Sequence, residues 1–180
     1  MERGPPGRSA EELKPKASNE MRIVLICVGR LRTGPERELF ARYFKRLGEM
    51  GRRVGVAGVD LRELDESRAR RPEERRNEEA TAITAVAPAE AEFVALDERG
   101  HSPTSEEWAA DIARVRDAAQ PSYAVVIGGP DGLSPLLLAK ASRIISFGAM
   151  TWPHQLVRVM ASEQLYRALT ILSGHPYHRP

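Results

Sequence analysis

Short apolar runs alternate with helix-like segments along most of the chain. Five runs rich in Val, Ile, Leu and Phe have the length of buried strands; they are residues 22–28, 54–59, 93–96, 123–127 and 144–147. The segments between or after them carry apolar residues at helical spacing. Because strands that alternate with helices usually pair in parallel, the sequence predicts an α/β fold with a largely parallel sheet.

Several helix starts carry specific signals. Thr104 is followed by Glu107, the spacing of a capping box, and Ser134-Pro135 combines an N-cap residue with a first-turn proline. Residues 62–79 hold six arginines and seven acids around Pro72. That segment is either a mobile loop or the solvated start of the next helix.

The last long segment, residues 155–172, has apolar side chains on more than one helical face. They are Leu156, Val157, Val159, Met160, Leu165, Leu169, Ile171 and Leu172. Such a wide apolar surface suggests a second buried contact. A homodimer interface would explain it, and so would a central core helix.

Length and composition limit the class of protein. A chain of 180 residues is typical of one domain with a sizeable core. Cys27, the single cysteine, lies in an apolar run, so we expect a reducing compartment and no disulfides. No apolar run is long enough to span a membrane, and residues 1–20 lack the hydrophobic region of a secretory signal. We therefore predict a cytoplasmic protein without membrane contact, with residues 1–20 as a disordered extension or upstream start and residues 21–180 as one domain.

Positive charge is concentrated near the beginning of the chain. Residues 22–53 hold nine basic and three acidic residues. Arg42, Lys45 and Arg46 are spaced three and four residues apart and share one helical face. A solvated helix face is the ordinary explanation, and a phosphate-binding patch is the functional one.

Two loops with glycine and proline follow strand-like runs, where α/β folds bind their ligands. The first, residues 128–133, matches neither G-x-G-x-x-G nor a P-loop, so it offers mainly backbone groups and could also be a simple turn. The second, residues 148–154, contains Trp152, which fits either core packing or a pocket wall. His175 and His178 have H-x-x-H spacing, but without cysteines or an evident carboxylate ligand we predict no metal site.

Three stretches and the end of the chain resemble one family. They read VVIGGPDGLS at 125–134, SFGAMTWPHQLVRV at 146–159 and EQLYRA at 163–168, and the chain ends near Tyr177-His178-Arg179. Together they resemble the RlmH family of ribosomal RNA methyltransferases, minimal members of the SPOUT superfamily. The resemblance runs in register from Met21 to Arg179.

The resemblance implies methyl transfer from S-adenosylmethionine to N3 of a pseudouridine in 23S rRNA. The target lies in the hairpin that faces the decoding centre, and the substrate is the assembled ribosome. A C-terminal trefoil knot and a homodimer are also implied. By position, the cofactor contacts correspond to Leu96, Gly128, Phe147, Gly148, Ala149, Met150, Thr151 and Trp152. Residues 148 and 149 are smaller here than in many family members, which main-chain contacts would tolerate.

Methyl transfer from a sulfonium needs no metal, but the N3 proton must leave. Our candidates for a base, a stabilising cation or an RNA contact are His154, Arg158, Tyr177 and His178, and Arg179 joins Arg42, Lys45 and Arg46 as an RNA-binding candidate. Arg158 or Arg167 could instead pair with Glu163, and for Arg167 we predict that structural role.

Two other functions remain open from the sequence. One is a SPOUT methyltransferase that acts on tRNA. The other is a ribosome-associated RNA-binding dimer without catalysis. Saturable S-adenosylmethionine binding would favour an enzyme over the non-catalytic dimer.

Overall fold

Five parallel strands form the centre of the molecule. The computed structural model describes residues 21–179, so the predicted extension at 1–20 and Pro180 lie outside the described residues. The strands are β1 (Met21–Val28), β2 (Val56–Leu64), β3 (Ala91–His101), β4 (Ser122–Ile127) and β5 (Arg143–Ile145), in the order β2-β1-β4-β3-β5. Every neighbouring pair is parallel, which confirms the predicted fold class.

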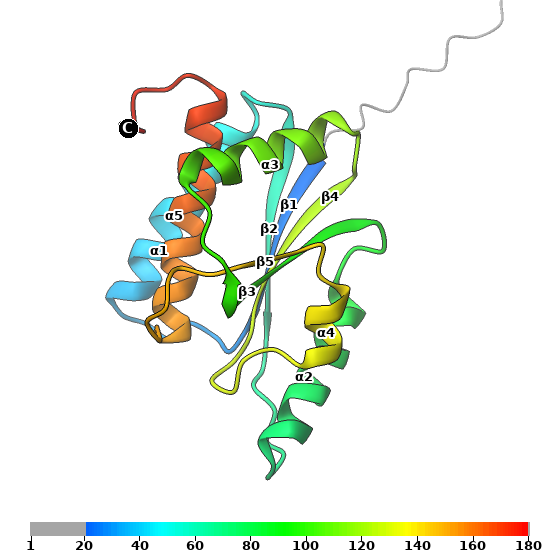
Figure 1. Ribbon diagram of the computed structural model, residues 1–180. Coiled ribbons are helices and arrows are strands. Elements are labelled where there is room, and N and C mark those ends of the chain that lie inside the picture. Colours follow the sequence, from blue (N-terminus) through cyan, green and yellow to red (C-terminus); the bar gives the residue numbers. More distant parts are fainter. Residues whose placement is uncertain (1–20, 180) are drawn as a thin grey trace, which may run out of the picture.

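Helices cover both faces of this sheet (Figure 1). One face carries α1 (Pro35–Gly51), α3 (Ser105–Asp117) and α5 (His154–Leu172), and the other carries α2 (Pro72–Val86) and α4 (Pro135–Lys140). Alternate residues of β1 serve the two cores: Ile23 and Leu25 face the first set of helices, whereas Val24 and Ile26 face the second. The strand is apolar throughout because both of its faces are buried.

The predicted helix starts are present. The Glu107 N–H donates to the Thr104 hydroxyl at 3.1 Å, and the Thr104 N–H donates to the Glu107 carboxylate at 2.8 Å, which confirms the capping box. The Ser134 hydroxyl accepts from the Leu137 N–H at 3.2 Å, ahead of Pro135. These contacts satisfy backbone donors that have no partner inside the helix.

Some predicted bounds were wrong. The second strand begins at Val56, because the Val54 N–H bonds the Gly51 carbonyl at 3.0 Å in the turn that ends α1. It continues to Leu64, so the start of segment 62–79 is strand and its later part opens α2 at Pro72. The last strand ends at Ile145, which leaves Phe147 in the following loop.

The end of β3 bends around β5. Both Leu96 and His101 pair with Ile145, with residues 97–100 between them. A Cβ on Gly100 would lie 2.6 Å from the carbonyl carbon of Ile144, so only glycine fits this bend. The loop 146–153 leaves β5 directly after the paired residue Ile145, while the trefoil knot itself stays a prediction.

Helix α5 runs beside α1 and is largely buried (Figure 1). Val159, Leu165 and Leu169 belong to the core, so packing within the chain accounts for much of its apolar surface. Leu156, near its start, stays 38% exposed. Within residues 21–179, no helix is long and apolar enough to cross a membrane.

Candidate active site

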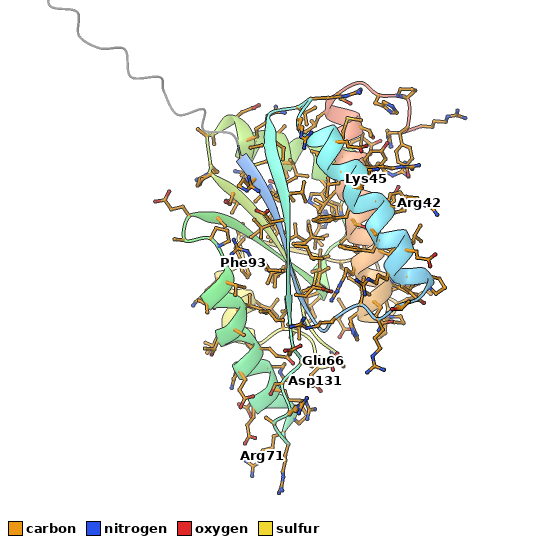
Figure 2. All side chains as sticks on the ribbon, turned by 180° about the vertical axis from the view of Figure 1, so that it is seen from behind. Arg42, Lys45, Glu66, Arg71, Phe93 and Asp131 are labelled. Carbon is orange, nitrogen blue, oxygen red and sulfur yellow. The ribbon has the colours of Figure 1, made fainter. Side chains whose placement is uncertain are left out.

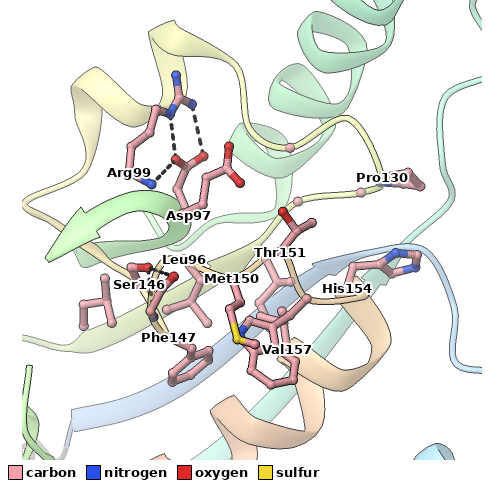
Figure 3. Close-up of a pocket in the computed structure, with 18 of the residues that line it drawn as sticks. Leu96, Asp97, Arg99, Pro130, Ser146, Phe147, Met150, Thr151, His154 and Val157 are labelled. Carbon is pink, nitrogen blue, oxygen red and sulfur yellow. Dashed lines mark hydrogen bonds and ion pairs between the residues drawn. The ribbon is translucent and has the colours of Figure 1, made fainter. Parts of the chain in front are cut away.

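A cavity of about 250 Å³ opens where the carboxyl ends of β3, β4 and β5 meet (Figure 3). Its walls are the end of β3 from Leu96, the loop 128–132 after β4, the loop after β5, and the first turn of α5. The carboxyl edge of a parallel sheet is where open α/β folds bind ligands, because loops from separate strands converge there. The cavity is therefore the leading candidate for a functional site.

The loop after β4 offers the cavity mainly backbone groups, together with the side chains of Pro130 and Asp131. The Gly132 N–H donates to the Gly129 carbonyl at 3.0 Å, and Gly132 has φ +78°. A Cβ on Gly128 would lie 2.9 Å from the Gly132 carbonyl carbon. The loop folds back on itself so tightly that glycine is required at these positions.

The loop after β5 forms an apolar wall. The Ser146 hydroxyl donates to the Gly148 carbonyl at 2.9 Å and accepts from the Gly148 N–H at 3.2 Å, which fixes the turn. The ring of Phe147 lies 6.2 Å from that of the buried Trp108. Met150 and Trp152 are 65% and 38% exposed, so the loop presents apolar side chains to solvent beside the cavity.

Carboxylates line part of the cavity, and arginines hold two of them in the charged form. Arg99 donates two hydrogen bonds to Asp97, at 2.8 and 3.1 Å, and this contact lowers the pKa of Asp97. Arg75 binds both oxygens of Asp131, at 2.5 and 2.9 Å, and lowers the pKa of Asp131 in the same way. Glu98 also lines the cavity. Arg99 and Arg75 compensate the charges of Asp97 and Asp131, so this rim mainly offers carboxylate oxygens as hydrogen-bond acceptors.

His154 lines the cavity at the end distant from Phe147 (Figure 3). Its Nε2 lies 3.8 Å from Glu66 Oε1, and its side chain is 25% exposed. Gly29, with φ +85°, leaves room for both groups, since a Cβ there would lie 2.9 Å from the Glu66 carboxylate. A half-buried imidazole beside a carboxylate has the geometry needed to exchange a proton with a substrate.

Arg158 is placed differently from the other candidates. It is 1% exposed and does not line the cavity. Its guanidinium bonds Glu63 at 2.5 Å and donates to the carbonyls of Val28 and Gly29 at 3.3 and 2.6 Å. The possible pairing of Arg158 with Glu163 is therefore wrong, whereas the predicted pairing of Arg167 with Glu163 is confirmed at 2.5 Å.

The C-terminal residues pack against α3 and α5, outside the cavity lining. The Tyr177 hydroxyl donates to Glu163 at 2.9 Å, and burial is the main cause that raises the pKa of Tyr177. His178 Nε2 lies 2.6 Å from Glu106 Oε1, on α3. Arg179 is exposed.

Arg42, Lys45 and Arg46 are exposed on α1. Figure 2 shows Arg42 and Lys45 well separated from Glu66 and Asp131, which mark the cavity region. A ligand that contacted both regions would have to extend across the molecule.

Seven of the eight predicted cofactor residues line the cavity. They are Leu96, Gly128, Phe147, Gly148, Met150, Thr151 and Trp152, whereas Ala149 is exposed and outside the lining. Sequence reasoning missed Glu66, Arg75 and the Asp97–Arg99 pair. Asp97 had a signal, because it directly follows a predicted strand. Among residues 21–179, no group of three or more His, Cys, Asp or Glu side chains is placed to hold a metal ion.

Comparison with known proteins agrees with this geometry. The family model described as Predicted SPOUT methyltransferase matches residues 21–178. A Bradyrhizobium protein is 55% identical over 159 residues, covering 88% of this chain and 99% of its own length. Proteins from Methylocella silvestris and Rhodopseudomonas palustris are each 54% identical with the same coverage. All three are named "Ribosomal RNA large subunit methyltransferase H". The chain belongs to the SPOUT methyltransferases, in the family of these relatives.

Proposed function

We propose that this protein transfers a methyl group from S-adenosylmethionine to N3 of a pseudouridine in 23S rRNA. The substrate is the assembled ribosome in the cytoplasm, and the enzyme acts as a homodimer. The observation that carries the proposal is the cavity at the carboxyl ends of β3, β4 and β5, built from the two loops that resemble the family.

The cavity fits the cofactor chemically. Leu96, Ile127 and Val157 give it apolar walls for an adenine ring, and the glycine-rich loop offers backbone groups for polar edges. The oxygens of Asp97, Glu98 and Asp131 can accept hydrogen bonds from the ammonium group. Its volume of about 250 Å³ is slightly below the roughly 300–1,000 Å³ of small-ligand sites. S-adenosylmethionine supplies an electrophilic methyl group there.

His154 is our candidate to accept the N3 proton of the pseudouridine. It lies at the cavity wall, and its Nε2 is 3.8 Å from the Glu66 carboxylate, to which a proton taken from the substrate can be directed. Arg158 acts as a positioning residue, because it ties α5 to the carbonyls of Val28 and Gly29 four residues after His154. Exclusion of water falls to the apolar side chains of the loop 147–152.

Tyr177, His178 and Arg179 contact RNA in this proposal, together with the α1 face of Arg42, Lys45 and Arg46. All three α1 side chains are exposed, as binding to phosphates requires. Charge reversal at Arg42, Lys45 and Arg46 should weaken ribosome binding and reduce its salt dependence. An unchanged salt dependence would remove α1 from the interface.

Exposed apolar side chains near the cavity support the homodimer. Met150, Trp152 and Leu156 are exposed in the loop after β5 and at the start of α5, and Leu39 is exposed on α1. A second copy would cover such side chains. Light scattering of the purified protein should give twice the mass of the chain.

The decisive experiment is labelled methyl transfer from S-adenosylmethionine, with nucleoside mass spectrometry of the product. Unmodified ribosomes and deproteinised rRNA are offered in parallel, and cofactor binding is measured by calorimetry. We expect N3-methylpseudouridine with ribosomes only. Cofactor binding without transfer would redirect the search to another RNA such as tRNA, and failure of both would favour a non-catalytic RNA-binding dimer.

A further inference from the structure

Three exposed arginines lie in the loop between β2 and α2. We call residues 67–71 the arginine loop; its exposed cations are Arg68, Arg70 and Arg71. Among residues 21–179, Arg68 and Arg70 form no ion pair, and Arg71 has only Glu74 at 3.8 Å, with its side chain 81% exposed. The three guanidinium groups are therefore available to an anionic partner.

The backbone of the arginine loop is held by specific contacts. The Ser67 N–H donates to the buried Glu79 at 3.0 Å, and the Ala69 N–H donates to the Ser67 hydroxyl at 3.1 Å. Arg75 donates from Nη1 to the carbonyls of Ala69 and Arg70, at 3.0 and 3.1 Å. The loop thus presents its arginines from a fixed backbone, which reduces the entropy lost on binding.

The same contacts join the arginine loop to the cavity. The remaining nitrogens of the Arg75 guanidinium bind Asp131, which lines the cavity. Glu79 lies directly beneath the loop after β4, since a Cβ on Gly129 would lie 3.3 Å from Glu79 Oε2. The Arg75 guanidinium and the Glu79 carboxylate therefore set the position of the three arginines relative to the candidate active site.

Three neighbouring acids contact groups other than the three arginines. Asp65 pairs with Arg30, Glu66 faces His154, and Glu78 bonds the Ser67 hydroxyl. Glu73 and Glu74 in the first turn of α2 are also exposed beside the loop, and Glu74 lies 3.8 Å from Arg71. Figure 2 places Arg71 on the far side of Glu66 and Asp131 from Arg42 and Lys45, so the arginine loop is a separate surface from the α1 face.

We propose that the arginine loop binds the phosphodiester backbone of the substrate RNA next to the target nucleotide, and that Arg75 positions the loop relative to the cavity. Guanidinium groups suit this partner because their planar donors match phosphate oxygens. The inference rests on the proposed RNA methyltransferase function and adds the surface that positions the substrate.

The test replaces Arg68, Arg70 and Arg71 together by Gln. Binding of the full-length protein to unmodified ribosomes is measured over a range of salt concentrations, with KM for ribosomes, kcat and the affinity for S-adenosylmethionine. Loss of three phosphate contacts should make the slope of log K against log salt less negative by about 2, and raise KM by about tenfold or more. Cofactor affinity should not change. The matched control is Arg52→Gln with Arg53→Gln, two exposed arginines between α1 and β2, and it should retain the wild-type KM and slope.

A second variant tests the connection through Arg75. Arg75→Met keeps the three exposed arginines but removes their link to Asp131, so the salt slope should stay near wild type while kcat falls. Thermal unfolding establishes that each variant is folded. A triple variant with wild-type slope and KM, beside an active wild-type enzyme, would overturn the arginine loop as an RNA contact. A wild-type protein that neither binds ribosomes nor transfers methyl groups would instead overturn the proposed function.

Discussion

Arg158→Met is the change for which the structure gives the clearest energetic expectation. The Arg158 side chain is 1% exposed, and its charge is compensated by Glu63 at 2.5 Å. Two further hydrogen bonds reach the carbonyls of Val28 and Gly29. Methionine fills a similar volume but supplies none of these donors, so the variant isolates the polar contacts from the packing.

The loss in the free energy of unfolding depends on how well the Glu63 carboxylate is compensated once Arg158 is gone. Removing one partner of a buried ion pair costs about 3–5 kcal/mol. Glu63 keeps 29% exposure and still accepts from the Leu31 N–H at 3.1 Å, so water and this donor partly compensate its charge. We therefore expect the lower end, about 3 kcal/mol, which corresponds to a melting temperature lower by roughly 6–12 °C for a domain of this size.

Urea unfolding at fixed protein concentration measures this loss. The matched control is Arg167→Met, which removes a 24% exposed side chain from an i,i+4 pair with Glu163 and should cost about 0.5 kcal/mol. Adding Glu63→Gln to Arg158→Met should recover part of the stability, because the stranded charge is gone. Equal small losses for the two arginine variants would refute the assignment of Arg158 to a structural role.

Two further predictions concern the bend of β3 at Gly100 and the burial of the Cys27 thiol. Gly100→Ala places a Cβ 2.6 Å from the Ile144 backbone, so it should destabilise the protein by about 2 kcal/mol or prevent folding. The control is Gly48→Ala, whose Cβ would meet nothing within 4 Å and which should be neutral or slightly stabilising. Thermal unfolding measures both. Burial raises the pKa of Cys27 to about 12, so the native thiol should resist alkylation at pH 8–10 unless the protein unfolds. Above pH ~9 the unfolded state releases this proton while the native state keeps it, so the free energy of unfolding should fall as pH rises from there. Rapid alkylation of the native protein would contradict the burial of Cys27.

The sequence predicted the strands well where both faces are buried, and poorly where pairing alone sets the length. Residues 22–28 and 123–127 are continuous apolar runs and match β1 and β4 within one residue. The end of β3 is polar from Asp97 to Gly100 and shows no strand periodicity. Its length comes from pairing with β5 and from the bend at Gly100, which are contacts that a local pattern does not encode.

In the candidate site, too, local patterns predicted some features, whereas contacts between distant residues could not be predicted. The glycine-containing loops could be predicted because a turn after a strand needs specific residues at specific positions. The pair Arg167–Glu163 could be predicted because the two residues are one helical turn apart. Arg158 and Glu63 are 95 residues apart in sequence, and no pattern along the chain connects them. Only the fold brings the end of β2 beside α5.

The first turns of α5 bring the proposed base and a buried structural contact together. His154 and Arg158 are four residues apart and therefore project from the same side of the helix. Arg158 holds the carbonyls of Val28 and Gly29, while His154 approaches Glu66 across Gly29. The orientation of the imidazole thus depends on a buried contact one turn further along the helix. A folded Arg158→Met protein should accordingly lose turnover while retaining the cavity walls contributed by β3, β4 and the loop after β5.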